Sequence, residues 1–343
     1  MGAGRPSPDM STAEPDRIPT FWPDGGGEVP LQPVARLIYA SMSLVQGSHL
    51  DEMQRIREHA EARNQQHGLR VALLTMSGWF VEWIEGPDEA VQALMQRVVR
   101  DPRHHGLKII HRSVGRPRLF MPWSGAIVQS PERTDAFGLR VFELLERHER
   151  GESLEPASIW LTLCSPPMVN MPAPLGSYPR AMLLSARGTR AFELLAWLAA
   201  EHRQPLVRRR FTGSMADARD VESDYLDIPG PGGGGLRLIA NARKALAMGM
   251  THAFLPDYGA VVVLLDAEPV LNQNLVDRVV EACRQVHHCP LIVGVGAPSV
   301  TDDALRDQVE RQGLAWQGAP TASETPGLAD LWAALAPTLQ RLG

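Results

Sequence analysis

The chain has 343 residues, of which 44% are hydrophobic and 21% are charged, and it carries a formal net charge of −5. These values are typical of a folded globular protein, and the mildly acidic balance argues against nucleic acid or an anionic membrane as a partner. No segment is long and apolar enough to cross a membrane or to act as a secretion signal, so we expect a cytoplasmic protein.

Residues 1–30 are rich in proline, glycine, aspartate and serine, which predicts a disordered tail. The three cysteines, Cys164, Cys283 and Cys289, fit a reducing compartment better than a disulfide framework, and we expect them to be small core residues. The segment CRQVHHC, which contains the last two, matches no zinc-binding spacing, so we predict no metal site.

Residues 31–150 are predicted to form the first domain, because strand and helix patterns alternate regularly along them. The expected elements are a strand at 34–41, a helix at 49–66, strands at 71–76 and 79–85 joined by Ser77-Gly78, a helix from Pro87, and strands at 107–111 and 119–128. The order βαββαββ predicts an α+β, ferredoxin-like sheet with two helices on one face. An amphipathic helix is expected at 132–149.

Residues 151–178 contain several prolines and serines and are predicted to be a linker to a second domain at 179–343. This second domain is expected to have strands at 180–185, 205–210, 260–266 and 290–295, and helices at 189–201, 236–248, 276–286 and 328–342. The two continuous apolar runs, AVVVLLD and PLIVGV, are typical of strands buried on both faces of a parallel sheet. The pattern therefore predicts an α/β, doubly wound fold.

Four short sequence motifs follow one another along the first domain. They are RLIYAS at 36–41, Arg63-Asn64 at the end of the first helix, GWFVEWIEGPDEAV at 78–91, and the pair RDPRHHGLKII and RLFMPWSG between 100 and 125. In this arrangement residues 34–128 resemble the BLUF family, the sensors of blue light that use FAD.

This resemblance implies a flavin held between the two helices, with Tyr39 and Asn64 at its polar edge. It implies further flavin contacts from a small set of residues: Ser41, Arg103, His104 and Trp123. In the family, light drives electron and proton transfer from the tyrosine, so Tyr39 is the photochemical candidate. FAD is accordingly the expected cofactor.

Three positions depart from the family pattern: Glu82 stands in place of the glutamine, Gly125 in place of a methionine, and Arg70-Val71 in place of a Thr-Gly pair. An ionised carboxylate only accepts hydrogen bonds, whereas a glutamine amide also donates. Glu82 would therefore face the flavin acceptors O4 and N5 unfavourably unless burial keeps it protonated. We expect weak or lost flavin binding and an altered photocycle.

The second half weakly resembles a Ras-like small GTPase, with residues 226–232 (LDIPGPG) near the position of its Asp-x-x-Gly switch. Its nucleotide motifs are absent. The two lysines, Lys108 and Lys244, lie in no phosphate-binding loop, and Ala297-Pro298 follows the strand after which the base-reading Asn-Lys-x-Asp is expected. This predicts a pseudo-GTPase without nucleotide hydrolysis.

The sequence leaves three hypotheses. The first is a blue-light sensor that signals through contacts with a protein partner, which includes a homo-dimer. The second is a flavin-free, light-independent interaction or scaffold protein. The third, an enzyme whose second domain binds a nucleotide in another way, is the one we favour least, so we predict a non-enzymatic protein.

Overall fold

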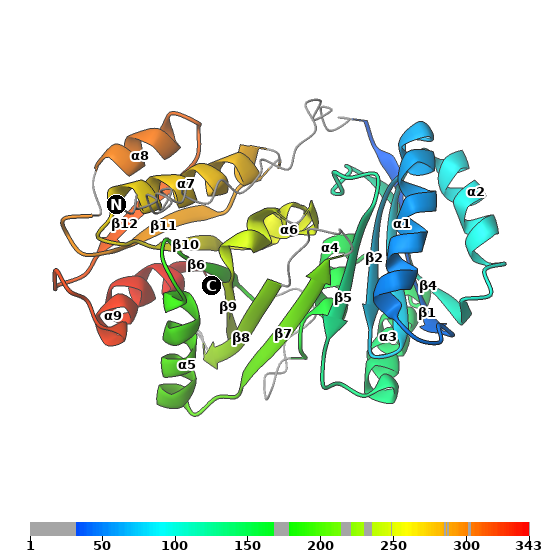
Figure 1. The fold of residues 1–343 in the computed structure, drawn as a ribbon, viewed down its shortest axis with the longest axis horizontal. Coiled ribbons are helices and arrows are strands. Elements are labelled where there is room, and N and C mark those ends of the chain that lie inside the picture. Colours follow the sequence, from blue (N-terminus) through cyan, green and yellow to red (C-terminus); the bar gives the residue numbers. More distant parts are fainter. Residues whose placement is uncertain are drawn as a thin grey trace, which may run out of the picture.

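A computed structural model describes residues 32–167, 178–213, 221–229, 235–247, 249–284, 286, 288–300 and 303–342. The tail predicted at 1–30 lies outside the described residues. One twelve-stranded sheet runs through both halves of the molecule (Figure 1), in the order β12-β11-β10-β6-β9-β8-β7-β5-β2-β3-β1-β4.

The first half has the predicted order of elements. They are β1 (Val34–Ser43), α1 (His49–Gln66), β2 (Arg70–Met76), β3 (Trp79–Gly86), α2 (Asp88–Val98), β4 (His104–Gly115), β5 (Ser124–Gln129) and α3 (Thr134–Glu149). The turn between β2 and β3 has positive φ at both Ser77 and Gly78, as a tight two-residue hairpin requires. The expected βαββαββ pattern is confirmed.

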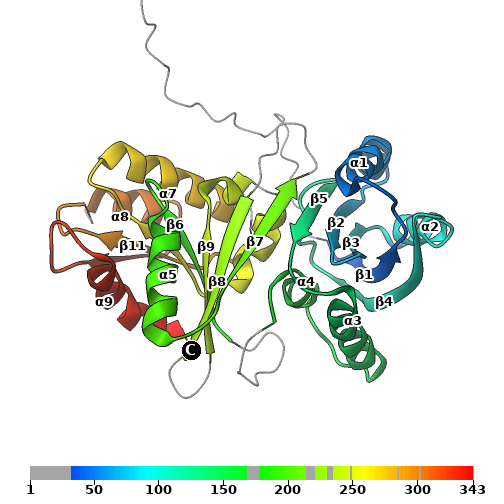
Figure 2. The same ribbon diagram turned by 60° about the horizontal axis from the view of Figure 1, so that its bottom comes forward.

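The sheet of the first half is covered on both faces (Figure 2). Strand side chains alternate, so Leu37 and Tyr39 of β1 face α1 and α2, whereas Ile38 faces α3 and the helix α4 (Pro156–Cys164). The strand β3 behaves in the same way. Its residues Phe80 and Ile84 pack with the first pair of helices, which puts the intervening position 82 on that face as well.

The predicted linker at 151–178 contains a buried helix, α4. Its side chains Ile159, Trp160 and Leu163 are at most 1% exposed and pack in a core shared with both halves. Such an apolar segment is buried because a helix that is hydrophobic all round cannot face water. Residues 168–177 lie outside the described part of the chain.

The second half continues the same sheet. Its elements are β6 (Arg180–Ser185), α5 (Arg190–His202), β7 (Leu206–Gly213), β8 (Val221–Pro229), β9 (Gly235–Asn241), η2 (Arg243–Ala247), α6 (Gly249–Phe254), η3 (Leu255–Asp257), β10 (Ala260–Leu264), α7 (Pro269–Arg284), β11 (Leu291–Gly296), α8 (Asp303–Glu310), β12 (Trp316–Pro320), α9 (Leu328–Leu339) and η4 (Gln340–Leu342). Strands β12, β11, β10, β6 and β9 are parallel, and β8 and β7 follow as antiparallel strands. Helices α5 and α9 cover one face, and α6, α7 and α8 cover the other.

The prediction of a helix at 236–248 is wrong. Residues 235–241 form the central strand β9, and only a 3-10 turn follows at 243–247. Leu236 and Leu238 pack toward α5, whereas Ile239 packs toward the opposite core. A short apolar run buried on both faces has no helical or strand periodicity of its own, so its neighbours in the sheet decide its conformation.

Of the predicted switch segment 226–232, only residues 226–229 are described, and they do not occupy the place of a switch loop. Pro229 pairs with Gly235 at the beginning of β9, and β9 runs parallel to β6. The end of β8 therefore lies beside the beginning of β6, at the opposite end of the strands from the loop that follows β6. Within the described residues, Asp227 forms an ion pair with the buried Arg237 on the neighbouring strand.

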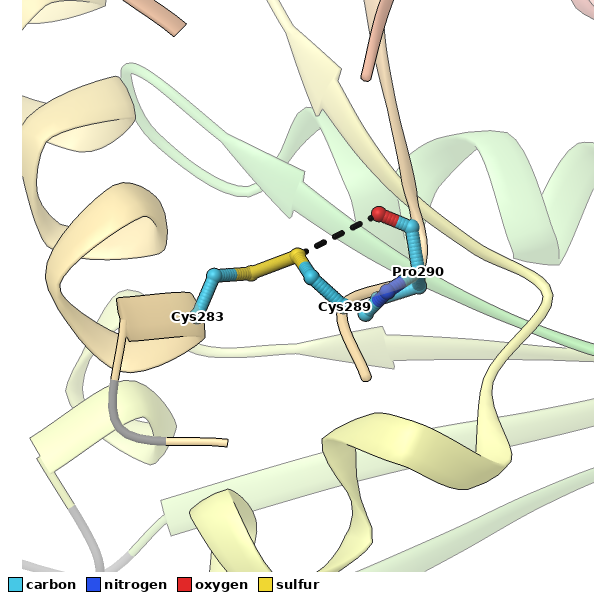
Figure 3. The surroundings of a disulfide bond; sticks show 3 residues. All are labelled: Cys283, Cys289 and Pro290. Carbon is cyan, nitrogen blue, oxygen red and sulfur yellow. Dashed lines mark hydrogen bonds between the residues drawn. A yellow bond between two sulfur atoms is a disulfide. The ribbon is translucent and has the colours of Figure 1, made fainter. Parts of the chain in front are cut away.

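Two of the cysteines form a disulfide, contrary to the prediction of reduced thiols. Cys283 at the end of α7 is joined to Cys289, whose sulfur lies 3.3 Å from the Pro290 carbonyl oxygen (Figure 3). The third cysteine, Cys164, is free and buried. Among the described residues no cluster of three or more histidine, cysteine, aspartate or glutamate side chains has the geometry of a metal site. Nor does any described helix have the length and apolarity needed to span a membrane.

Candidate functional site

A cavity of about 480 Å³ lies between α1 and α2, above the strands β1, β2 and β3. This volume is within the range of pockets that bind cofactors and other small molecules. Five of the seven predicted site residues line it: Tyr39, Asn64, Glu82, Arg103 and His104. The structure therefore brings together residues that lie 65 positions apart in the sequence.

Tyr39 and Glu82 form the floor of the cavity. They are directly opposite each other in the antiparallel pairing of β1 and β3, and they are 4% and 7% exposed. Opposed side chains on one face of such a pair lie about 5 Å apart at Cβ, which brings the phenol and the carboxyl together. The Glu82 Oε2 atom is buried and has no hydrogen-bond partner within the described structure.

Burial determines the ionisation of both groups. Desolvation raises the pKa of Glu82 to about 7, although the hydroxyl of Tyr39, as a hydrogen-bond donor, lowers it in part. Desolvation and the neighbouring Glu82 carboxylate raise the pKa of Tyr39 well above its ordinary value. Near neutral pH the floor of the cavity therefore holds a neutral phenol beside an acid that is half protonated.

Asn64 lies on the α1 wall of the cavity and is 2% exposed. Its Nδ2 donates to the carbonyl oxygen of Pro122 at 3.0 Å. That bond fixes the orientation of the amide, and it leaves the amide oxygen and the second N–H of the amide group for a ligand. Pro122 belongs to the segment between β4 and β5, so this segment is attached to the cavity wall.

Arg103 and His104 stand beside the cavity at the start of β4. The guanidinium of Arg103 is shared between two carboxylates, Asp101 and Glu52, and these ion pairs raise its pKa and lower theirs. Burial lowers the pKa of His104, whose Nδ1 has no hydrogen-bond partner among the described residues. Arg103 thus acts as a structural tie between β4 and α1, and His104 is a neutral group with an uncommitted nitrogen.

The structure does not place Ser41 or Trp123 among the residues that line the cavity. Ser41 is fully buried, and its hydroxyl is unpartnered in the described structure. Trp123 packs in the apolar cluster that also contains the cavity-lining Leu73 and Phe80, and it covers Gly125, where an added Cβ would overlap its ring and lie 2.8 Å from Met53 Cε. The glycine therefore allows Trp123 to lie inward, in the space that a methionine side chain at 125 would fill.

The sequence interpretation missed most of the α1 and α2 walls. The cavity is also lined by Glu52, Arg55, Ile56, His59, Ala60, Arg63, Leu73, Phe80, Leu94, Arg97, Val98 and Asp101. Positions 52, 56, 60 and 63 follow helical spacing, so once one wall residue of α1 is known, the periodicity gives the others. No comparable signal identified Asp101.

A family comparison agrees with this geometry. The model of the BLUF family, described as sensors of blue-light using FAD, matches residues 34–126. These residues form a BLUF domain. The match ends within β5, so it covers the cavity and leaves α3, α4 and the whole second half outside the family model.

One curated relative is the photoactivated adenylate cyclase subunit beta of Euglena gracilis, which is 34% identical over 84 residues. This match covers 24% of the present chain and only 10% of the cyclase subunit. Among solved structures, BlsA in its ground state matches 40% of the chain and 91% of its own length, at 18% identity and a TM-score of 0.28. A manganese and cy-diGMP complex of Klebsiella pneumoniae BlrP1 matches 88% of the chain and 78% of its own, at 16% identity and a TM-score of 0.26.

The residues of the cavity fit a flavin in part. Its volume, the fixed amide of Asn64 and the buried unpartnered atoms of Glu82 and His104 are what a polar ring system requires. The carboxyl of Glu82 differs from the glutamine expected there, since it donates a hydrogen bond only when protonated. The flavin contacts of the individual residues stay predictions.

Proposed function

We propose that this protein is a flavin-binding sensor of the blue-light type, in which the BLUF domain binds FAD between α1 and α2 and passes its state to the second half. The observation that carries the proposal is the cavity itself, because it joins Tyr39, Asn64 and Glu82 on a domain of this family. A bound flavin supplies the light absorption and the electron acceptor. The chain supplies a neutral phenol at Tyr39, a fixed amide at Asn64 and a titratable acid at Glu82.

The proposed roles follow from the ionisation of these groups. Tyr39 is the electron and proton donor, and the adjacent carboxyl of Glu82 is positioned to take up the phenolic proton when ionised. The amide of Asn64, which Pro122 holds in place through one N–H, orients a ligand through its oxygen or its second N–H. Arg103 keeps β4 against α1 through its two carboxylate partners, which keeps the cavity wall in place.

Three contacts support transmission to the second half. The edge strand β5 of the BLUF domain pairs with β7, with Ala126 opposite Gly213. Arg118, in the segment between β4 and β5, donates to the carbonyl oxygen of Ala253 at 2.6 and 3.1 Å and forms an ion pair with Asp257. The indole of Trp83, next to Glu82 on β3, lies 6.4 Å between ring centroids from Phe254 of α6.

The Arg118 contact gives a continuous route from the cavity. Near the beginning of the segment 116–123, the side chain of Arg118 binds α6 and η3. Near its end, the carbonyl oxygen of Pro122 accepts a hydrogen bond from Asn64. Glu85 also fixes the backbone of this segment, since its carboxylate accepts hydrogen bonds from the N–H groups of Arg118 and Leu119 at 2.7 and 2.8 Å. A ligand that reorients Asn64 therefore acts on a segment whose far end is bound to the second half.

We further propose that the second half is a GTPase-like fold that works through protein contacts and not by turnover. The strand order β8-β9-β6-β10-β11-β12, with β8 antiparallel, supports this relationship. The loop after β6 contains Arg187, which lies 3.8 Å from Asp266 and 3.6 Å from Glu268, so acidic groups surround the place of the phosphate loop. Calorimetric titration with GTP and ATP tests this point, and we expect no heat of binding.

Flavin binding is tested with a pair of tryptophan variants on α1. Ala60 lines the cavity, whereas Ala62 is exposed on the same helix. The protein reconstituted with FAD should give a flavin absorption spectrum, Ala60→Trp should abolish it by filling the cavity, and Ala62→Trp should retain it. Flavin bound equally by Ala60→Trp would place the cofactor elsewhere, and no flavin bound by the unmodified protein would favour the flavin-free scaffold. A reversible spectral shift under blue light then tests the photochemical role.

A further inference from the structure

The mouth of the cavity between α1 and α2 is basic. Among the described residues that line this cavity, every exposed one is an arginine or a histidine: Arg55, His59 and Arg63 on α1, and Arg97 on α2. The three residues on α1 are spaced four apart, so their side chains form one row along the helix. We call these four residues the basic mouth.

Two of the arginines in the basic mouth have no carboxylate beside them. Arg55 is paired with an acid of its own helix, but neither Arg63 nor Arg97 forms an ion pair within the described part of the chain. By contrast, Arg57, which lies on the same helix outside the cavity, pairs with Glu61 at 3.0 Å. A guanidinium without a carboxylate partner keeps its N–H groups available for an anionic ligand, above all for phosphate.

The cavity lining as a whole is positive, although the protein has a net charge of −5. Four arginines line the cavity, whereas its fully ionised acids are Glu52 and Asp101, whose pKa values are lowered by their hydrogen bonds to Arg103. The third acid, Glu82, is only partly ionised near neutral pH because burial raises its pKa to about 7. A concave surface with an excess of positive charge attracts anions and raises their local concentration.

The floor of the cavity is unsuited to a charged ligand group. Leu73 and Phe80 are 4% exposed and line the cavity together with Tyr39 and Glu82. Burial of a phosphate against apolar side chains and a carboxyl group would remove its hydration without supplying an opposite charge, which is strongly unfavourable. A ligand with an uncharged ring and an anionic tail therefore binds with its ring against the floor and its tail at the basic mouth.

We propose, on the basis of the proposed flavin site, that Arg63 and Arg97 make the cavity selective for the phosphorylated flavins FMN and FAD over riboflavin. The three ligands share one uncharged ring system and differ in the tail. The tail of riboflavin ends in a hydroxyl group, whereas the phosphate groups of FMN and FAD carry about two negative charges near neutral pH. Arg63 and Arg97 stabilise this charge at the mouth, and Arg55 adds to the same positive field.

The test is a fluorescence titration of the full chain with riboflavin and with FMN, at about 0.05 M and about 0.5 M sodium chloride. At the lower salt concentration we expect FMN to bind about tenfold more tightly, since a hydrogen bond to a charged group contributes about that factor. At the higher concentration this preference should shrink, because salt screens charges that are exposed to solvent. The affinity for riboflavin should change little with salt.

The double variant Arg63→Gln with Arg97→Gln should bind FMN and riboflavin equally. Its affinity for riboflavin should equal that of the unmodified chain, which also shows that the variant is folded. The control is the double variant Arg57→Gln with Arg112→Gln, which removes the same charge from two arginines of the BLUF half that do not line the cavity. This control should keep the preference for FMN.

Equal affinities of the unmodified chain for FMN and riboflavin, or a preference that does not depend on salt, would overturn the selectivity and leave the flavin site standing. A preference for FMN that survives in the double variant Arg63→Gln with Arg97→Gln would overturn the role of these two arginines. Failure of both ligands to bind to the unmodified chain would overturn the flavin site, and the selectivity with it.

Discussion

Tyr39 and Glu82 are opposed residues of β1 and β3. Glu82 raises the pKa of Tyr39, and the hydroxyl of Tyr39 lowers the pKa of Glu82. This pair makes stability depend on pH in a predictable direction. An acid whose pKa rises on folding binds more protons in the native state than in the unfolded chain. Its contribution to stability is therefore largest below the unfolded pKa and is lost as pH rises to the folded pKa.

For Glu82 the window extends from the unfolded value, about 4.3, to about 7 in the folded protein. The loss across this window is about 4 kcal/mol. Glu82→Gln should therefore raise the free energy of unfolding at pH 8 and have little effect at pH 4.5, as measured by urea denaturation. His111, whose pKa burial lowers to about 4, gives the opposite slope, but it is common to both proteins and cancels in the difference. An equal effect at both pH values would show that Glu82 is not buried as an acid.

Gly125 should be required for the inward position of Trp123. A Cβ at 125 would overlap the indole ring and crowd Met53, and overpacking of this kind costs about 1–3 kcal/mol. Gly125→Ala is therefore expected to lower the unfolding midpoint and to shift the Trp123 indole signal in an NMR spectrum. Gly318→Ala is the control, because a Cβ there meets only Trp316 Nε1 at 3.9 Å. An unchanged Trp123 signal in Gly125→Ala would contradict the packing described.

The order of elements in the BLUF domain was predictable because its amphipathic patterns are long and its turns carry clear signals. Ser77-Gly78 marks the hairpin, and Ser48 caps α1 by accepting from the Asp51 N–H at 3.2 Å. The grouping of Tyr39 with Glu82 came from the resemblance to the family, because strands buried on both faces show no polar alternation that would assign a face. The cost of burying an acid within the aromatic strand WFVEWI also indicates a site, an interface or an exposed edge at Glu82.

Other features depended on contacts distant in the sequence. The helix α4 and the strand β9 are short apolar segments whose surroundings, not their periodicity, determine their conformation. Ser41 lies two residues after Tyr39 on β1, so alternation predicts the same face for both, yet Ser41 is not among the residues that line the cavity. The disulfide between Cys283 and Cys289 depends on how α7 ends relative to β11, which no spacing rule provided.

The link from Arg118 to the second half should be needed for transmission. Arg118→Ala removes the donors to Ala253 and Asp257 and should release α6 and η3, whereas Arg116→Ala, in the same segment but exposed, should not. We expect FAD to slow amide hydrogen exchange in residues 251–257 of the unmodified protein and of Arg116→Ala, but not in Arg118→Ala. FAD binding itself should be retained in all three. Protection that persists in Arg118→Ala would point to Trp83 and Phe254 as the route.

The disulfide should stabilise the second half modestly. Closing a loop with a sequence separation of 6 restricts the unfolded chain by about 2 kcal/mol in the loop-entropy account. Reduction, or the double variant Cys283→Ser with Cys289→Ser, is therefore expected to lower the unfolding midpoint. Titration of thiols in the unfolded, unreduced chain should detect Cys164 alone. Detection of three thiols would show that the purified protein lacks the bond.

Arg209 should be among the residues whose truncation costs most. This side chain of β7 is 2% exposed, yet it extends into the BLUF half, where it lies 3.1 Å from Met76 Sδ and donates to the Cys164 carbonyl oxygen. It also lies 3.4 Å from Glu132, which forms a closer ion pair with Arg140. Removing one partner of a buried charged network leaves the others uncompensated, so Arg209→Ala should lower the free energy of unfolding by about 3–5 kcal/mol.

The next residue provides the control. The side chain of Arg210 is 46% exposed and pairs with Glu222, and such surface pairs contribute about 1 kcal/mol or less. Chemical denaturation of Arg210→Ala should therefore show a small effect. If the two halves are held together through Arg209, its loss should also separate the single unfolding transition into two. A single transition with a loss no larger than that of Arg210→Ala would mean that the pairing of β5 with β7 joins the halves without this network.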